Sequence, residues 1–339
     1  MRYSDAQIVL WQDRFLKVPG VKSLREESAQ NHLQEILIKN ASMRVDSFAY
    51  SLPYYIFTGR NGAWVYWHNN VPVIVCWHPN RNGDLLVYPA GCNAGEAIVS
   101  LFDLMPNPPG KVQIARISDV TASNLEAALQ DNDCIGQIRC TDEPVLDWLF
   151  PAHVLSTKEA SSLSGNKFYY ARRKYRSFDK SGFAFEEFAA KHVPDMQSIG
   201  QKYARVFKSL YPEFVLTPNE ILKSHEDMLS VALKNKEIMN SVVLKYQGQT
   251  VGMVVWDVID NTANALWFVF DREIDNLGFA QVVEASKMLQ KQGIEYLNLG
   301  GSETEGMDFF KTRFRPVQSF PLTSVFVKLD KHSIFSVAA

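Results

Sequence analysis

The residues of this chain that could do chemistry are gathered between Tyr296 and Pro316, in the sequence Y-L-N-L-G-G-S-E-T-E-G-M-D-F-F-K-T-R-F-R-P. A short apolar strand runs into Gly300 and Gly301, where no Cβ keeps a ligand away from the backbone. A helix that starts just after such a turn directs unpaired N–H groups at that ligand. The pattern indicates a site for an anion or a carbonyl group. A tight turn followed by an ordinary basic helix is the alternative.

Charged side chains surround these two glycines. Ser302 and Glu303 follow the turn directly, and Lys311 and Arg313 place positive charge on the helix. Glu303 is either a base or a carboxylate that stabilises the N-terminal end of the helix dipole. The seven histidines are scattered along the chain, and none is predicted to take part in the site.

A second cluster of charge lies in residues 165–180, G-N-K-F-Y-Y-A-R-R-K-Y-R-S-F-D-K. On a helix this segment has an apolar face of Phe168, Ala171, Tyr175 and Phe178, and an opposite cationic face of Arg173, Arg176 and Lys180 with Arg172 at its border. A cationic stripe of this kind suits contact with RNA phosphates, a phospholipid headgroup or a pyrophosphate. A solvated helix balanced by acidic residues elsewhere is the alternative.

The composition limits the class of protein. The chain has 339 residues, of which 46% are hydrophobic and 21% charged, which suits two globular domains. A net charge of −2 argues against a molecule that is basic as a whole. The four cysteines form no C-x-x-C pair, so no metal site is predicted. There is no signal-peptide pattern and no apolar run of about 20 residues, and we expect a cytoplasmic protein without a transmembrane segment.

The first half of the chain alternates helical and strand patterns. Helices are predicted at 21–39, 94–105 and 121–130, and strands at 54–57, 63–68, 71–77, 85–88, 111–117, 135–140 and 145–150.

In the second half, helices are predicted at 195–211, 218–235 and 278–292, and strands at 241–246, 250–258, 263–270 and 295–299. Thr217, Pro218 and Glu220 form a capping box at the second of these helices. The tail at 319–329 is predicted to be a closing strand or hairpin.

Two stretches resemble a known family. L-S-G-N-K-F-Y-Y-A-R-R-K-Y-R-S-F resembles the basic helix of the family that includes the C-terminal catalytic domain of lysylphosphatidylglycerol synthases. L-N-L-G-G-S-E-T-E-G-M-D-F-F-K-T-R-F-R-P resembles the late motif of the FemA/FemB/FemX peptidoglycan aminoacyltransferases. The resemblance, with the order of elements, implies an α+β fold of two GNAT-like domains in tandem. The expected domains are a degenerate one at 1–150 and a catalytic one at 151–339.

The resemblance also implies an activity, the transfer of an aminoacyl group from aminoacyl-tRNA to an amine or hydroxyl acceptor on a small molecule, peptide or lipid headgroup. It also implies a place for Lys311 near the tRNA acceptor end and the reacting ester. For that reaction Lys311 is the expected oxyanion donor and Glu303 the nearest candidate base, with the terminal ribose or water as alternatives. The residues expected to bind substrate are Asn298, Gly300, Gly301, Ser302, Phe310, Arg313 and Trp267, and those expected to bind tRNA phosphates are Arg172, Arg173, Lys174 and Arg176. Packing in the core is the alternative role for Trp267, which sits on a predicted strand.

Some features depart from the family. Neither the flippase domain of the lipid-modifying enzymes nor the helical arm of the Fem enzymes is evident, which favours a smaller acceptor. The loop Arg272–Ala280, R-E-I-D-N-L-G-F-A, keeps only Gly278 and Ala280 of the acyl-CoA-binding pattern of GNAT enzymes. No other cofactor is predicted. An N-acyltransferase that uses acyl-CoA or acyl-carrier protein, and a non-catalytic protein that binds a nucleotide or headgroup, remain as alternatives.

Overall fold

The computed structural model describes residues 4–41, 46–90, 94–117, 125, 135–140, 150–178, 180–212, 214 and 216–329, with side chains except at 135–140, 328 and 329. The chain divides into two compact units. Unit 1 comprises residues 1–45, 58–143 and 321–339, and unit 2 comprises residues 46–57 and 144–320. A segment from the first half of the chain is therefore part of unit 2, and the C-terminal tail is part of unit 1.

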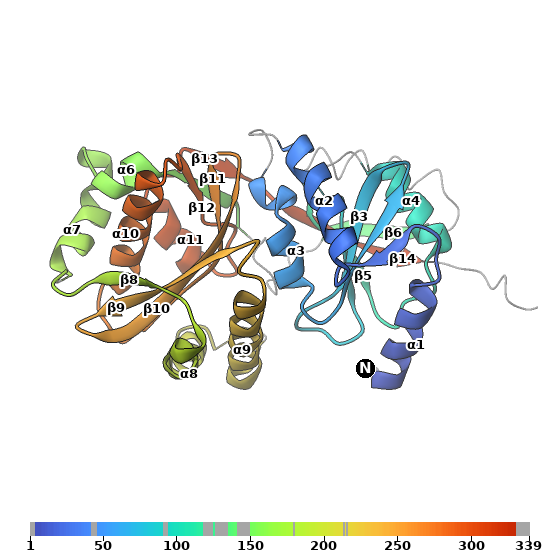
Figure 1. Cartoon of the computed structure of the whole chain (residues 1–339), viewed down its shortest axis with the longest axis horizontal. Coiled ribbons are helices and arrows are strands. Elements are labelled where there is room, and N and C mark those ends of the chain that lie inside the picture. The colour runs from blue at the N-terminus through green and yellow to red at the C-terminus, as the bar shows by residue number, and fades with distance from the viewer. Residues whose placement is uncertain are drawn as a thin grey trace, which may run out of the picture. The chain divides into compact units, whose positions relative to one another are not determined.

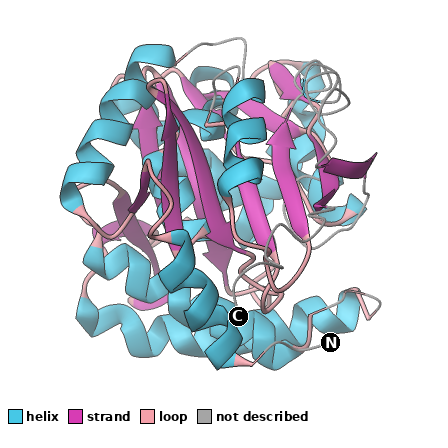
Figure 2. Cartoon of the chain, turned by 90° about the vertical axis from the view of Figure 1, so that its right-hand side faces the viewer, coloured by secondary structure: helices cyan, strands magenta, loops and turns pink. Residues whose placement is uncertain are grey.

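Unit 1 is a seven-stranded sheet with helices (Figures 1 and 2). Its helices are α1 (Asp5–Phe15), α2 (Glu27–Asn40) and α4 (Gly95–Leu104). Its strands are β1 (Val21–Ser23), β2 (Ala63–His68), β3 (Val71–Trp77), β4 (Leu85–Tyr88), β5 (Val112–Ile117), β6 (Ile135–Cys140) and β14 (Thr323–Leu329), in the order β1-β2-β3-β4-β5-β14-β6. Its core includes a tryptophan cluster around Trp11, Trp64 and Trp77.

Unit 2 is also built on a seven-stranded sheet, in the order β13-β7-β12-β11-β10-β9-β8. Its strands are β7 (Ala152–Ser156), β8 (Ala184–Glu187), β9 (Asn240–Tyr246), β10 (Gln249–Ile259), β11 (Thr262–Phe270), β12 (Tyr296–Asn298) and β13 (Gln318–Phe320). Its helices are η1 (Ser47–Tyr50), α3 (Leu52–Thr58), α6 (Thr157–Ser162), η2 (Asn166–Phe168), α7 (Tyr169–Ser177), η3 (Ala190–His192), α8 (Val193–Leu210), α9 (Pro218–Lys234), α10 (Leu277–Lys291) and α11 (Glu305–Thr312).

The two faces of the unit 2 sheet carry different helices. Figure 1 shows α10 with α6 and α7 on one face and α8 with α9 on the other. Because side chains alternate along a strand, Val254 and Trp256 of β10 pack toward α10, whereas Met253 and Val255 pack toward α8 and α9. Each face of the sheet is therefore covered by its own apolar core.

Both sheets follow one plan. From β1 to β6 and from β8 to β13, each has three antiparallel pairs, then one parallel pair, then two antiparallel pairs. The sixth strand of each sheet is exchanged: β7 follows β6 in the chain but pairs in unit 2, and β14 follows β13 but pairs in unit 1. The expected tandem of two α+β, GNAT-like sheets is confirmed, although the sequence shows no repeat.

Most predicted elements of the described residues are present, and two predictions were wrong. The helix expected at 21–39 begins only at Glu27, since Val21–Ser23 pair with β2 as a strand. The strand expected at 54–57 lies in helix α3, which starts at Leu52 beside Pro53, a residue favoured in a first helical turn. Its β-branched and aromatic residues are buried against neighbours, and such packing overrides local propensity.

Other predictions have different outcomes. The capping box of α9 is confirmed, with Thr217 Oγ1 accepting from the Glu220 N–H at 3.3 Å. The tail forms strands, β13 and β14, but not a hairpin, because they belong to different sheets. The helix expected at 121–130 and the strand at 145–150 lie outside the described residues, apart from residues 125 and 150. No helix in the described part of the chain has the length and apolar character that a bilayer crossing requires.

Candidate active site

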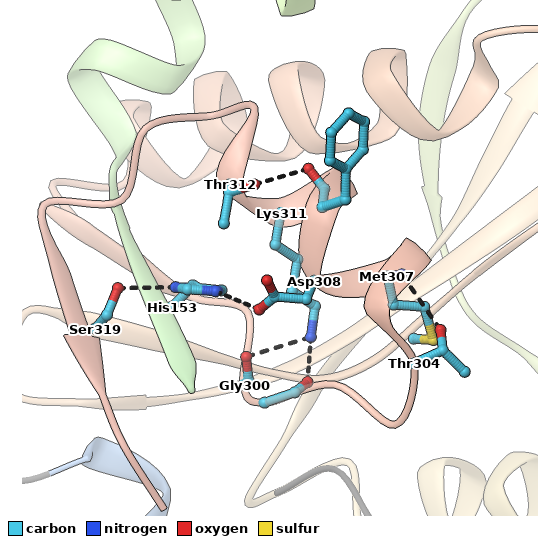
Figure 3. A network of polar contacts seen from close by, with 10 residues as sticks. His153, Gly300, Thr304, Met307, Asp308, Lys311, Thr312 and Ser319 are labelled. Carbon is cyan, nitrogen blue, oxygen red and sulfur yellow. Dashed lines mark hydrogen bonds and ion pairs between the residues drawn. The ribbon is translucent and has the colours of Figure 1, made fainter. Parts of the chain in front are cut away.

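The diglycine turn after β12 is fixed from two sides. Gly300 has a φ of +66°, a left-handed conformation that favours glycine, and its N–H donates to Asn298 Oδ1 at 2.9 Å. The ammonium group of Lys311 on α11 donates to the carbonyl oxygen of Gly300 at 3.2 Å and also to that of Gly301 (Figure 3). Lys311 is only 9% exposed. Its positive charge is therefore held, away from water, against the backbone of the turn.

The turn lies where β11 and β12 separate. The two strands pair in parallel only from Thr262–Tyr296 to Asn264–Asn298. Beyond that point the chain follows β7 instead: the Leu299 N–H donates to the His153 carbonyl at 2.8 Å, and the His153 N–H donates to the Gly300 carbonyl at 3.2 Å. The rest of β11 is therefore not paired with β12. We call the point where the two strands separate the vertex, and the diglycine turn lies there.

A buried polar row crosses the sheet next to this vertex. Asp257 on β10 is paired with Asn264 on β11, and Asn264 with Asn298 on β12. Asn298 Nδ2 donates to Asp46 Oδ1 at 2.7 Å and to Ser47 Oγ at 2.9 Å. The Ser47 hydroxyl in turn donates to Asn264 Oδ1. The row therefore fastens the segment Asp46–Phe57 to unit 2 while it also holds the diglycine turn.

Asp257 is the least satisfied member of this row. Neither of its carboxylate oxygens has a hydrogen-bond partner among the described residues. Burial raises the pKa of its carboxyl group from 3.8 to about 6, although Ser51 and Asn264, which face it, oppose part of the rise. The Asn264 Nδ2 donor is also buried and unpartnered among the described residues.

Glu303 faces helix α8. Tyr203 on α8 is buried, and burial is the main reason why the pKa of its hydroxyl is raised; the negative charge of Glu303 adds to the rise, and the positive charge of Arg272 opposes it. Next to Glu303, α11 begins with Thr304 as its N-cap, whose hydroxyl accepts from the Met307 N–H at 3.3 Å. Tyr211 also reaches this helix, since a Cβ on Gly306 would lie 2.1 Å from its hydroxyl oxygen.

Trp267 belongs to the same side of the sheet. It is buried at 8% exposure and lies edge-on to His225, with ring centroids 5.2 Å apart. The His225 ring is also 4.9 Å from Tyr203, and burial, assisted by the charge of Arg272, lowers the pKa of His225 to about 4. Trp267 is thus a core residue. The His225 ring lies between it and Tyr203, which is near Glu303.

A Ser-His-Asp contact that the sequence did not predict adjoins the turn. His153 on β7 is buried, and its Nε2–H donates to Asp308 Oδ1 on α11 at 2.8 Å, since a carboxylate only accepts (Figure 3). Its Nδ1 lies 2.8 Å from Ser319 Oγ on β13. Ser319 and His153 face each other in the strand register, whereas Asp308 is 155 positions away from the histidine. Spacing along the chain carries no signal for such a contact.

The Phe-Lys pair points in two directions. Lys311 turns toward the diglycine turn, whereas Phe310 packs on Phe279 and Phe314, with ring centroids 5.0 and 5.5 Å away. Arg313 lies over the rings of Phe309 and Tyr170, 3.5 and 5.0 Å from their centroids. Since Tyr170 is on α7, this stacking joins the basic helix to α11.

The basic helix has the predicted two faces. Phe168, Ala171 and Phe178 are buried and Tyr175 is half-buried. On the other side Arg173 and Arg176 are exposed, and Lys174 is half-buried with its ammonium 5.9 Å from the Tyr170 ring. Arg172 differs, because its guanidinium group donates to the carbonyl oxygens of Leu163 and Gly165.

Gly278, in the first turn of α10, is closely packed. A Cβ on Gly278 would lie 2.6 Å from the ring of Phe270, so the glycine is required by the approach of this ring. Among the described residues no three His, Cys, Asp or Glu side chains gather as a metal site would need.

The structure thus brings together some of the predicted residues. Asn298, Gly300, Gly301 and Lys311 form one network, and Ser302 extends it, with its hydroxyl oxygen buried and unpartnered among the described residues. No role was predicted from the sequence for Asp257, His153, Asp308 or Arg272. Each makes contacts with residues remote in the sequence, such as that of His153 with Asp308, and only the fold makes these contacts.

Comparison with known proteins gives a fold and no sequence relative. No protein-family model matches the chain, and no curated protein matches it. A conserved protein of unknown function from Bacteroides thetaiotaomicron has a similar structure, with a TM-score of 0.65 and 15% identity over 92% of this chain and 99% of that one. FemX is similar with a TM-score of 0.56 and 9% identity, over 90% of this chain and 96% of that one.

A third similar structure is described as the C-terminal domain of a lysylphosphatidylglycerol synthetase from Agrobacterium fabrum. Its TM-score is 0.51 and its identity 14%, over 86% of this chain and 92% of that domain. The resemblance to lysylphosphatidylglycerol synthase C-terminal domains and FemAB-like proteins is therefore confirmed as a likeness of fold. The chain has the tandem fold of these structures.

Proposed function

We propose that this chain transfers an aminoacyl group from aminoacyl-tRNA to an amine or hydroxyl acceptor. The observation that carries the proposal is the buried ammonium group of Lys311, held against the diglycine turn at the vertex where β11 and β12 separate. A fixed positive charge next to a turn stabilises the negative charge that develops on a carbonyl oxygen during acyl transfer.

The reaction assigns a task to each group. The acceptor amine attacks the ester carbonyl carbon of the aminoacyl-tRNA, a C–N bond forms, and the bond to the ribose oxygen breaks. Lys311 and the N–H groups that follow Gly301 stabilise the oxyanion. Glu303 takes the proton from the attacking amine and gives it to the ribose oxygen, which leaves as a hydroxyl group.

Exposed cations on α7 support a donor that is rich in phosphate. Arg173 and Arg176 are solvent-exposed on a helix that contacts α11 through the stacking of Tyr170 on Arg313. Phosphate contacts of this kind make binding strongly dependent on salt concentration. Arg172 contributes less in this proposal, because its guanidinium group already binds two backbone carbonyl groups.

Acyl-CoA is the less favoured donor. A pyrophosphate cradle requires free N–H groups on an open glycine-rich turn. Here Gly278 is packed against the ring of Phe270, which accounts for this glycine without a ligand. Asp275 in the same loop adds a negative charge that would repel a pyrophosphate.

The test measures binding and turnover of both donors. The protein is titrated with charged tRNA and with acetyl-CoA at several salt concentrations, and transfer of a radiolabelled aminoacyl group to a pool of amines is followed. We expect tRNA binding to weaken steeply with salt and to lose much of this dependence in Arg173→Glu/Arg176→Glu. The matched control is Lys191→Glu/Lys223→Glu, which makes the same charge change at exposed lysines of unit 2.

Three other outcomes would count against the proposal. Tight binding of acetyl-CoA without an effect of tRNA would favour an N-acyltransferase. Donor binding without turnover of any acceptor would favour a non-catalytic binding protein. Unchanged turnover in Lys311→Met would remove the catalytic role of this lysine.

A further inference from the structure

The guanidinium group of Arg272 occupies an aromatic cage at the end of β11. Its central carbon lies 4.6 Å from the ring centroid of Tyr203, 5.7 Å from that of Phe207 and 5.8 Å from that of Phe270. Two of these rings come from α8 and the third from the last residue of β11. Such rings attract a cation and keep water from it.

Arg272 has no carboxylate partner among the described residues, although acidic residues flank it on both sides. Asp271 pairs instead with Lys202, at 2.8 Å. Glu273 pairs with Lys202 at 3.1 Å and with Arg205 at 2.9 Å. Both neighbouring carboxylates are thus bound by other cations, and neither forms an ion pair with the guanidinium group.

The hydrogen-bonding capacity of Arg272 is also largely unused. Its Nε is buried without an acceptor in the described part of the chain, and its one hydrogen bond there is a long one of 3.4 Å to the Tyr203 hydroxyl. The side chain as a whole is half-buried, but a buried charged N–H without an acceptor is costly, and stacking on rings offsets only part of that cost. A planar anion that accepts two hydrogen bonds would satisfy this fork-shaped donor.

The cage is next to the candidate active site. Tyr203 experiences the charges of both Arg272 and Glu303, so these two residues approach it from different elements. Glu303 directly follows Ser302 and the diglycine turn. A ligand anchored at Arg272 can therefore extend along Tyr203 toward the group that would remove a proton from the acceptor.

We propose that Arg272 binds the carboxylate of the acyl acceptor, so that the acceptor is a small amine with a carboxylate, such as an amino acid or a short peptide. The carboxylate pairs with the guanidinium fork, the rings of Tyr203 and Phe207 enclose the contact, and the amine points to Glu303. The identification of the ligand as an acceptor rests on the proposed transferase function. The carboxylate site itself rests only on Arg272 and its surroundings.

The test uses calorimetric titration of the full chain, without donor, against the common L-amino acids, glycyl dipeptides and the carboxamide of each. We expect at least one carboxylate ligand to bind, and its carboxamide to bind about 10- to 100-fold more weakly, since a charge-assisted pair is lost. Arg272→Met, which keeps the apolar stem between the rings, is expected to weaken binding by a similar factor. Lys223→Met, which removes an exposed cation of α9 that pairs with Asp227, should bind as the wild type does.

Several results would overturn the proposal. The first is that no carboxylate in the panel binds, and the second is that acids and carboxamides bind equally well. The third is that binding survives Arg272→Met but is lost in Arg313→Met, which changes the other stacked arginine of unit 2. Thermal unfolding of each variant distinguishes a lost contact from a lost fold, and Arg272→Lys provides a second variant that keeps the charge but not the fork.

Failure of this proposal is distinguishable from failure of the transferase function. If aminoacyl transfer occurs equally well to acceptors that lack a carboxylate, the role of Arg272 is wrong and the function stands. If carboxylates bind through Arg272 but no donor is ever consumed, the site stands and the transferase function is wrong.

Discussion

The two sheets share a plan but differ in one row of buried side chains. On the face of unit 1 that is turned away from α4, the row across β3, β4 and β5 consists of Cys76, Leu86 and Gln113. On the face of unit 2 that is turned away from α10, the row across β10, β11 and β12 consists of Asp257, Asn264 and Asn298. All six side chains are buried.

The chemistry of the two rows is different. In unit 1 burial raises the pKa of the Cys76 thiol and keeps it neutral, and the only amide, Gln113, donates to Ser324 Oγ at 2.9 Å. In unit 2 the row includes a carboxyl group and two amides with unused or shared hydrogen bonds. An apolar row would cost less to bury, so the polar row of unit 2 indicates that this unit, rather than unit 1, positions a site.

Deleting residues 321–339 should have the largest effect on stability. It should destabilise unit 1 and leave unit 2 folded. The deletion removes β14, which pairs with both β5 and β6 and buries Val325 and Val327 in the core of unit 1. We expect hydrogen exchange to show complete loss of protection in β5, while β11 keeps its protection because the sheet of unit 2 is intact. Equal loss of protection in β5 and β11 would mean that the two sheets do not fold as separate units.

Asn298→Leu is the next largest perturbation, because it makes the row of unit 2 resemble that of unit 1. The Gly300 N–H and the Asp46 carboxylate would each lose a partner. We expect the free energy of unfolding to fall by roughly 3 kcal/mol, because the buried Gly300 N–H would lose its acceptor and the charge-assisted hydrogen bond to Asp46 would be removed. Gln113→Leu is the matched change in unit 1 and should cost only about 1 kcal/mol.

Chemical denaturation checks this pair of variants. Similar losses in Asn298→Leu and Gln113→Leu would contradict the distinction between the two rows. Asn298→Leu should also release the diglycine turn, and we therefore expect transferase activity to fall with it, whereas Gln113→Leu should leave activity unchanged.

Asp257→Asn tests the polar row of unit 2 through the pH dependence of stability. The pKa of Asp257 is about 6 in the folded state against 3.8 for the free group, so the folded protein holds this proton more tightly. The contribution of Asp257 to the free energy of unfolding is therefore most favourable below about pH 4, and it is lost as the pH rises through 6. A difference of about two pKa units corresponds to about 3 kcal/mol.

We expect Asp257→Asn, which cannot ionise, to be more stable than the wild type by up to about 3 kcal/mol at pH 8 and equal to it near pH 4. The measurement is the free energy of unfolding of both proteins across this pH range. A constant difference at all pH values would show that Asp257 does not titrate in this range.

The elements of the fold followed from local patterns where these were strong. Runs of β-branched and aromatic residues between Asn- and Gly-rich turns predicted β2 and β3, and the Thr217 capping box predicted the start of α9. The strand β7 was missed, and its partner β12 lies some 140 residues later in the chain. The tail was predicted as a strand or hairpin, but the placement of β13 and β14 in different sheets was not predicted. Local sequence does not encode such pairing.

The candidate site was only partly predictable. The diglycine turn and Lys311 share one continuous motif, so their proximity could be inferred. The contact of Asn298 with Asp46 spans 252 positions, and that of His153 with Asp308 spans 155. Contacts of this range depend on how the sheet is assembled, and a single sequence carries no trace of them.

The smallest predicted effects concern the contact of Ser319, His153 and Asp308. Ser319 is exposed on a strand, and His153 ties β7 to the helix that carries Lys311. We expect Asp308→Asn to cost about 1 kcal/mol, because one partly exposed charge-assisted hydrogen bond becomes neutral, and Ser319→Ala to cost less.

The same variants decide whether this contact positions α11 or does chemistry. A serine nucleophile would react with a fluorophosphonate probe, and the label would disappear in Ser319→Ala. We expect no such labelling, and transferase activity within about threefold of the wild type in Ser319→Ala, since Lys311 keeps its contacts with the turn. Labelling of Ser319 that depends on His153 and Asp308 would instead make unit 2 the site of a covalent acyl-enzyme reaction, a second chemistry for which the sheet of unit 1 has no counterpart among its described residues.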